Sequence, residues 1–135
     1  MNTFFKSLTY SMLILTVLPV SIQAQTPDYK GNYFKNETPI QSPLRPNSAL
    51  SQGSLWRVTS NSLNCRRSAS VFSPIVRTYL KDNLLEVEVY RGGSDEVSMN
   101  YLDDNGKPWM PVRGGSYGDR CFVRANSLYI QPVMK

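Results

Sequence analysis

The chain has 135 residues, with 15 Lys and Arg against 10 Asp and Glu, a formal net charge of +5 and no histidine. This length suits one ordinary domain, and the basic balance favours anionic partners without indicating a fold. The absence of histidine excludes Ser-His-Asp and Cys-His catalysis and removes the commonest zinc ligand. Two cysteines cannot build a structural zinc site alone. Composition therefore argues against most small enzymes, and we expect no metal and no cofactor.

The first 24 residues have the pattern of a secretory signal peptide. Lys6 gives a positively charged start, residues 8–20 form a largely apolar run, and Ala24 supplies a small residue before the expected cleavage point. The alternative is a membrane anchor, but the apolar run is shorter than the roughly 20 residues that span a bilayer. We therefore expect residues 1–24 to be a signal peptide. The mature protein would be exported, to the periplasm or out of the cell, with no membrane span.

Residues 25–52 are predicted to be a disordered linker. The segment holds four of the nine prolines among Asn, Ser, Gln and Thr, a composition that favours extended conformations and offers little apolar surface to bury. Pro43 and Pro46 enclose a proline–x–x–proline sequence with Arg45 inside it, which is typical of peptides that dock into aromatic-lined grooves. One hypothesis is that this tethered segment occupies a groove of the following domain. The alternative is a plain spacer.

From residue 53 to residue 135, short apolar runs alternate with turns, which is typical of an all-β domain. Residues 84–90 alternate strictly and predict a half-buried strand. The other apolar runs lie at residues 55–58, 74–80, 109–113, 121–124 and 129–131. Residues 61–68 are predicted to be a turn and extended loop, and residues 91–106 a long polar loop that ends in a hairpin turn. No window has helical periodicity, so we expect about five short antiparallel strands.

Strict alternation also predicts which side chains form the core. Glu86 and Glu88 should face solvent, while the alternate positions face inward, and Trp56 is expected to pack in the interior. The predicted core residues are Val58, Leu63, Leu85, Val87, Val89, Met110, Val112, Val123 and Ile130.

Several segments, in the same order, resemble parts of bacterial SH3 domains. Residues 63–68, which read Leu-Asn-Cys-Arg-Arg-Ser, are similar to the family's leucine-asparagine-valine-arginine-serine sequence, with cysteine for valine and one extra arginine. Residues 104–112 resemble the family's turn–tryptophan–x–x–valine strand, and residues 121–130 its closing strand, short helical turn and last strand. The long loop at residues 91–106 departs from the family pattern. The resemblance implies a small, partly open SH3-like β-barrel that binds peptides or cell-wall material and performs no chemistry.

The resemblance also implies where a ligand would bind. In SH3-like folds, the tryptophan that opens the third strand and a tyrosine after the short helical turn line the peptide groove. The matching positions are Trp109 and Tyr129. The alternative for Trp109 is packing in a small core.

Cys65 and Cys121 are expected to form a disulfide, because an even cysteine count in an exported chain usually means pairing. The alternative is a redox or nucleophilic cysteine, which no histidine or nearby resolving cysteine supports. Guanidinium groups hold carboxylates or phosphates through bidentate hydrogen bonds. The disulfide would bring four flanking arginines into one candidate binding cluster: Arg66, Arg67, Arg120 and Arg124. The alternative is a solvated basic surface.

Two pairs of carboxylates are candidates for chemistry. Glu86 and Glu88 project from one face, and paired carboxylates can hydrolyse glycosidic bonds. The alternative is a charged solvent face that keeps the strand from aggregating. Asp103 and Asp104 are interpreted as turn residues, because the later glutamate of a calcium loop is missing.

The sequence therefore predicts an exported, non-catalytic binding module, not an enzyme. Its expected partner is a cell-wall peptide or another exported protein, with no nucleic acid, because the basic stretch is short and not interleaved with aromatics. The alternatives are a small carboxylate-dependent cell-wall hydrolase and a purely structural accessory subunit. The sequence indicates neither the exact ligand nor the oligomeric state.

Overall fold

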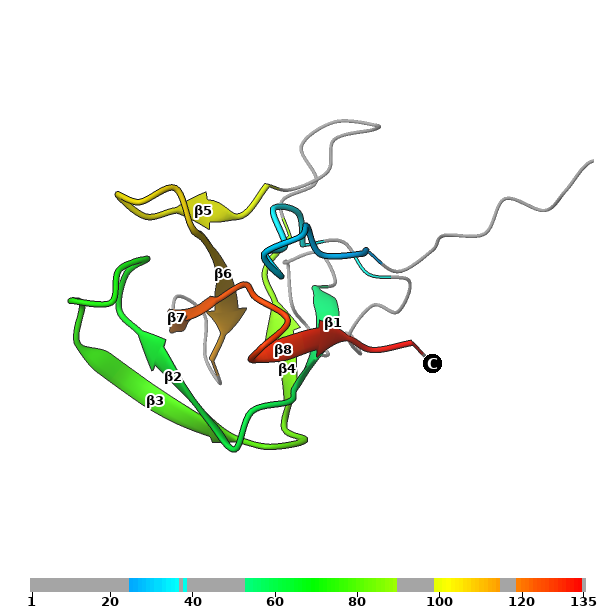
Figure 1. Cartoon of the computed structure of the whole chain (residues 1–135). Helices are drawn as coiled ribbons and strands as arrows, with labels where there is room; N and C mark the ends of the chain where they lie inside the picture. The colour runs from blue at the N-terminus through cyan, green and yellow to red at the C-terminus, as the bar shows by residue number, and fades with distance from the viewer. Residues whose placement is uncertain (1–24, 37, 39–52, 90–98, 115–118, 135) are drawn as a thin grey trace, which may run out of the picture.

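The computed structural model describes residues 25–36, 38, 53–89, 99–114 and 119–134 (Figure 1). Within these ranges the chain forms eight strands and no helix, and therefore no helix that could cross a membrane. The strands are β1 (Ser54–Val58), β2 (Ser62–Arg66), β3 (Ile75–Leu80), β4 (Leu84–Val87), β5 (Tyr101–Leu102), β6 (Pro108–Arg113), β7 (Arg120–Arg124) and β8 (Ile130–Pro132). The predicted signal peptide and the proline–x–x–proline segment lie outside the described residues.

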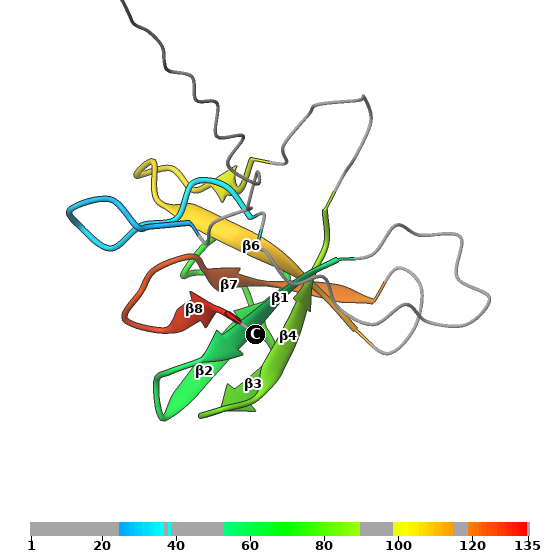
Figure 2. The same cartoon turned by 90° about the vertical axis from the view of Figure 1, so that its right-hand side faces the viewer.

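All strands belong to one antiparallel sheet with the order β3-β2-β7-β6-β4-β1-β8, and β5 pairs with β6 beside this path. In Figure 1, β2 and β3 form one wall of the curved sheet, β1, β4 and β8 form the other, and β6 and β7 connect them. Figure 2 shows β1 and β4 side by side. β3 and β8 are the two ends of this order, and among the described strands they do not pair with each other, so the sheet is not closed.

The all-β class is confirmed, while the expected number of about five strands is too low. β2 lies in residues 61–68 and β5 in residues 91–106, both of which were predicted to be loops. β2 was missed because its outward positions are polar, and β5 because it has only two residues. Both segments become strands because a neighbouring strand offers them an edge for hydrogen bonding. That edge exists only in the assembled sheet and leaves no signal in the segment's own sequence.

The predicted core is confirmed, because all nine of its residues are buried. In β4, Leu85 and Val87 face inward while Glu86 is only half-buried on the other face, as the alternation requires. Trp56 is fully buried at the centre of this cluster. Its indole Nε1 donates hydrogen bonds to Ser54 Oγ at 3.0 Å and to the Asn36 carbonyl at 3.4 Å, so the ring's polar edge is also satisfied.

The structure differs from the predicted linker at residues 28–36, which we call the N-terminal strap. Tyr33 is only 3% exposed and meets the Trp56 ring edge-on, with the ring centroids 4.8 Å apart. Burial raises the pKa of the Tyr33 hydroxyl. This part of the chain therefore completes the core, and the folded domain begins well before residue 53.

Backbone contacts tie the N-terminal strap to two distant parts of the chain. Tyr33 N–H donates to the Ala125 carbonyl at 2.9 Å, and Asn100 N–H donates to the Phe34 carbonyl at 2.8 Å. A further isolated bridge joins Lys35 to Met99, so the strap lies beside the segment that leads into β5 in both views (Figures 1 and 2). The strap was missed because a few hydrogen bonds and one aromatic side chain suffice to dock a polar segment.

Candidate functional site

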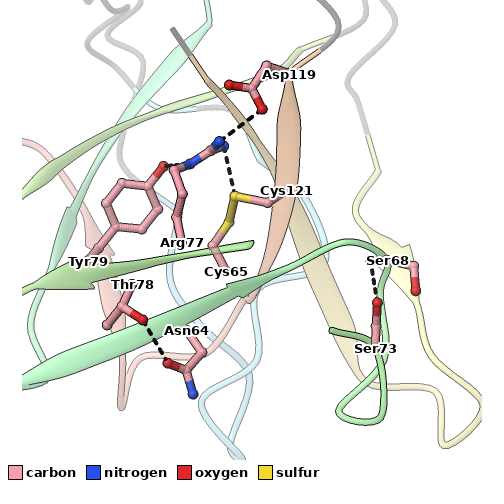
Figure 3. Close-up of a disulfide and its surroundings, with 9 residues drawn as sticks. All are labelled: Asn64, Cys65, Ser68, Ser73, Arg77, Thr78, Tyr79, Asp119 and Cys121. Carbon is pink, nitrogen blue, oxygen red and sulfur yellow. Dashed lines mark hydrogen bonds and ion pairs between the residues drawn. A yellow bond between two sulfur atoms is a disulfide. The ribbon is translucent and has the colours of Figure 1, made fainter. Parts of the chain in front are cut away.

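The predicted disulfide is present and joins β2 to β7 (Figure 3). Cys65 and Cys121 are both fully buried, and their Cα atoms lie 5.4 Å apart. The bond spans 56 positions of sequence, so it closes a long loop and restricts the unfolded chain. It is a structural bond in the core and is not exposed as a reactive centre.

The guanidinium beside the disulfide belongs to Arg77, which sequence reasoning did not select. Its Nη2 donates to Cys121 Sγ at 2.9 Å, Nη1 pairs with Asp119 Oδ1 at 3.0 Å, and Nε donates to the Tyr79 hydroxyl at 3.1 Å (Figure 3). Burial acts to lower the pKa of Arg77, but the hydrogen bonds to Tyr79 and Asp119 outweigh it, and the net pKa is raised. Only the pairing of β2 with β3, which sets Arg77 opposite Cys65, places this group here.

Three of the four predicted arginines lie on the outer face of the sheet. Strand alternation and pairing, and not the disulfide, place them on one face. The cysteines point into the core, so their neighbours on each strand point outward. Arg66 is the direct cross-strand partner of Phe122, and Arg120 and Arg124 flank Phe122 on the same face of β7. Arg67 lies beyond the end of β2 and is exposed, and its backbone N–H donates to the Pro74 carbonyl.

Arg120 is the arginine that forms a surface site. Its Nη1 pairs with Glu88 Oε1 at 2.6 Å, and its guanidinium carbon lies 5.3 Å from the Phe122 ring centroid and 5.7 Å from that of Tyr101. The two rings meet edge-on at 5.0 Å. The hydrogen bond to Glu88 is the main cause that raises the pKa of Arg120. We call Glu88, Tyr101, Arg120 and Phe122 the arginine–aromatic surface.

Arg124 and Arg66 have structural partners instead. Arg124 donates to the Pro108 carbonyl at 2.8 Å and to Asn32 Oδ1 at 3.1 Å, so it fastens the N-terminal strap. Burial lowers the pKa of Arg124. Arg66 donates to the Ser73 carbonyl at 2.9 Å and so supports the loop between β2 and β3.

Of the two aromatic residues predicted to line a groove, Trp109 is buried and Tyr129 is partly exposed. Trp109 is only 1% exposed, and its indole Nε1 donates to Asp103 Oδ2 at 2.9 Å. Tyr129 is half-buried against the core. Trp109 therefore packs inside the protein, as the alternative interpretation stated. Tyr101, which lies in the segment predicted to be a loop, is an exposed aromatic ring on the outer face. A two-residue strand leaves no periodic signal that could have revealed it.

Asp103 holds the turn before β6. Its Oδ1 accepts hydrogen bonds from the backbone N–H groups of Asn105 and Lys107 at 2.9 and 3.0 Å. Burial acts to raise the pKa of Asp103, but the hydrogen bonds, first that from Trp109, outweigh it and lower the pKa. Asp103 is therefore a turn residue, as the sequence indicated.

Glu86 and Glu88 each face a different arginine. Glu86 pairs with Arg113 Nη1 at 3.0 Å in a largely buried ion pair, and Glu88 pairs with Arg120. A glycosidase pair needs two carboxyl groups that flank one bond of the substrate, whereas these two carboxylates belong to separate ion pairs. Glu88 is partly exposed, but Glu86, with 15% of its side chain exposed, does not face solvent as the sequence predicts, because Arg113 covers it. In the part of the chain that the structure describes, no group of three or more His, Cys, Asp or Glu residues could hold a metal ion.

Comparison with known proteins finds no relative: no protein-family model, no curated protein and no solved structure matches the chain. The resemblance to bacterial SH3 domains therefore stays a prediction.

Proposed function

We propose that the protein is an exported, non-catalytic binding module whose arginine–aromatic surface recognises a carboxylate-bearing peptide, such as a cell-wall peptide. The observation that carries the proposal is the geometry of Arg120. The guanidinium lies over two aromatic rings and has one half-exposed carboxylate partner, Glu88. A planar guanidinium has five N–H donors and matches the two oxygens of a carboxylate. An incoming carboxylate would compete with Glu88 or share Arg120 with it.

The neighbouring residues support a peptide rather than a small ion as the ligand. Tyr101 is exposed beside Arg120, and Met99, two residues earlier in the chain, is exposed as well. Exposed aromatic and aliphatic side chains next to a cation suit a ligand that has both an apolar part and an acid group. The disulfide supports export, because such bonds persist in oxidising compartments.

We also propose that the domain is a bacterial SH3-like barrel. The segments that carry the resemblance fall on β2, β6, β7 and β8. Between β7 and β8, the N–H groups of Tyr129 and Ile130 both donate to the Asn126 carbonyl, which makes one helical turn where the resemblance implies it.

Sedimentation of the mature protein with purified peptidoglycan tests the proposal. We expect Arg120→Gln to weaken binding about tenfold, the scale of a lost charge-assisted contact. Glu88→Gln should strengthen binding about threefold, because it frees the guanidinium for the ligand. Arg57→Gln removes the same charge from β1, whose neighbours are β4 and β8, and should bind like the parent chain.

Two results would contradict this function. Equal losses for Arg120→Gln and Arg57→Gln would mean that binding depends only on net charge. No sedimentation of the parent chain, combined with stable capture of one exported protein, would favour the structural accessory alternative. Thermal unfolding of each variant checks that the fold is intact.

A further inference from the structure

The β2–β3 hairpin is basic and carries no acid. Residues 59–81 contain no Asp or Glu. They contain four cations, Arg66, Arg67, Arg77 and Lys81, of which Arg77 faces the disulfide and pairs with Asp119. Arg67 and Lys81 are exposed at the two ends of β3. This part of the surface is therefore complementary to an anionic partner.

The same hairpin exposes a concentration of apolar side chains. Phe72, at the tip of the loop, is 93% exposed, and Val71 beside it is more than half exposed. The hairpin supplies five of the thirteen large apolar side chains that are exposed among the described residues: Val71, Phe72, Ile75, Val76 and Leu80. Contiguous exposed apolar residues on a soluble protein usually mark a contact surface.

Internal hydrogen bonds hold this tip in place. Ser68 N–H donates to Ser73 Oγ at 2.9 Å (Figure 3), and Phe72 N–H donates to Ser70 Oγ at 3.1 Å. Arg66, the last residue of β2, also donates a hydrogen bond from Nη1 to the Ser73 carbonyl. The serines therefore fix the loop while the Phe72 ring stays outside, so little ordering entropy is lost when the tip meets a partner.

The edge of β3 does not favour addition of another strand. Leu80 N–H donates to Asn83 Oδ1 at 2.9 Å, and the Leu80 carbonyl accepts from Asn83 N–H at 3.0 Å, so both groups are already used. At the other end, the register between β2 and β3 shifts between Cys65 and Arg66. A strand partner is therefore disfavoured.

We propose that the tip of this hairpin, residues 67–76, docks the protein onto an anionic lipid surface. Phe72 and Val71 enter the boundary between headgroups and acyl chains, while Arg67, at the same end of the hairpin, contacts lipid phosphates. Apolar side chains backed by cations are the pattern of interfacial membrane binding. Two apolar side chains and one exposed cation give reversible attachment rather than insertion. This surface uses none of the residues of the arginine–aromatic surface and does not depend on its ligand.

Vesicle co-sedimentation of the full mature chain tests this inference. The probes are phosphatidylcholine vesicles with about 40% phosphatidylglycerol and vesicles of phosphatidylcholine alone. We expect binding to the anionic vesicles only, weakened about tenfold by Phe72→Ser and about threefold by Arg67→Gln. Leu128→Ser, which removes another largely exposed apolar side chain, on the turn before β8, should leave binding unchanged.

A second variant reports on insertion directly. The native tryptophans are buried, so Phe72→Trp adds an exposed fluorophore whose emission should shift to the blue with anionic vesicles. No binding to either vesicle, equal binding to both, or equal effects of Phe72→Ser and Leu128→Ser would overturn the proposal. Binding that survives Phe72→Ser would show electrostatic adsorption alone and would overturn it too. Peptidoglycan binding that requires Phe72 without vesicle binding would assign the tip to the wall ligand.

Discussion

The N-terminal strap and the β2–β3 hairpin reverse the usual relation between polarity and burial. The strap is a polar segment that was predicted to be a linker, yet Asn32, Tyr33 and Asn36 are buried. The hairpin holds an apolar run, yet Phe72 and Ile75 are exposed. The difference shows that burial here follows position in the sheet. The strap packs Tyr33 against Trp56 of the core, whereas β3 is an edge strand with one described neighbour.

The two regions also use asparagine and serine in opposite ways. In the strap, buried amides satisfy the backbone: Asn100 Nδ2 donates to the Tyr33 carbonyl at 2.8 Å, and Asn36 Nδ2 donates to the Glu88 carbonyl at 3.0 Å. In the hairpin, serine hydroxyls hold a loop whose apolar side chains face water. Polar side chains thus stabilise the interior contact of one region and the outward display of the other.

The largest effect on stability is expected from removing the buried aromatic ring of Tyr33. Tyr33→Ala leaves a cavity against Trp56 and should lower the free energy of unfolding by about 3–4 kcal/mol, the scale of a large-to-small core change. Tyr29→Ala, on an almost fully exposed side chain just before the strap's buried part, is the control and should cost about 0.5 kcal/mol or less. Equal effects in urea titrations would mean that the strap does not belong to the core.

The disulfide tests how the hairpin is attached. Replacing Cys65 and Cys121 together by Ala should cost about 2–4 kcal/mol, since the bond closes a long loop. The reduced parent chain should show a similar loss in denaturant titrations. Because the bond joins β2 to β7, hydrogen exchange should increase more in β2 and β3 than in β1 and β4. Uniform exchange would show that the hairpin is no more dependent on the bond than the rest of the sheet.

Asp103 offers an intermediate effect that depends on pH. Asp103→Asn removes a charged acceptor from Trp109 Nε1 and two backbone N–H groups, and should cost about 1–2 kcal/mol at neutral pH. The folded-state pKa of Asp103 is lowered, so its contribution is present above the unfolded pKa and is lost as pH falls through the folded pKa. The variant and parent should therefore converge in stability at low pH. Asp104→Asn, at an exposed position of the same turn, is the control and should change the free energy of unfolding by about 0.5 kcal/mol or less at neutral pH.

The smallest effect on stability is expected at the hairpin tip. Phe72→Ser should change the free energy of unfolding by about 0.5 kcal/mol or less, because the ring makes almost no buried contact. The same substitution is expected to weaken vesicle binding. Phe72 would then act in binding and not in stability, in contrast to Tyr33. A loss of several kcal/mol in thermal unfolding would instead show that Phe72 packs in solution.

Short-range patterns in the sequence were sufficient to predict the all-β class and the residues of the hydrophobic core. Alternation with a period of two identified core residues of the predicted strands, such as Leu85 and Val87, because side chains of a strand must point to opposite faces. The even cysteine count indicated the disulfide. The turn at Asp103 was predictable because a carboxylate at that position accepts hydrogen bonds from the N–H groups that follow it.

Contacts between distant segments were decided by the tertiary structure alone. The register of β2, β3 and β7 places Arg77 beside the disulfide and Arg120 over two aromatic rings, and no local pattern contains that register. Burial of Tyr33 depends on contacts with Trp56, Ala125 and Asn100, which only the folded chain brings together. The residues of one strand determine which side chains share a face, but pairing across the sheet determines what each face meets.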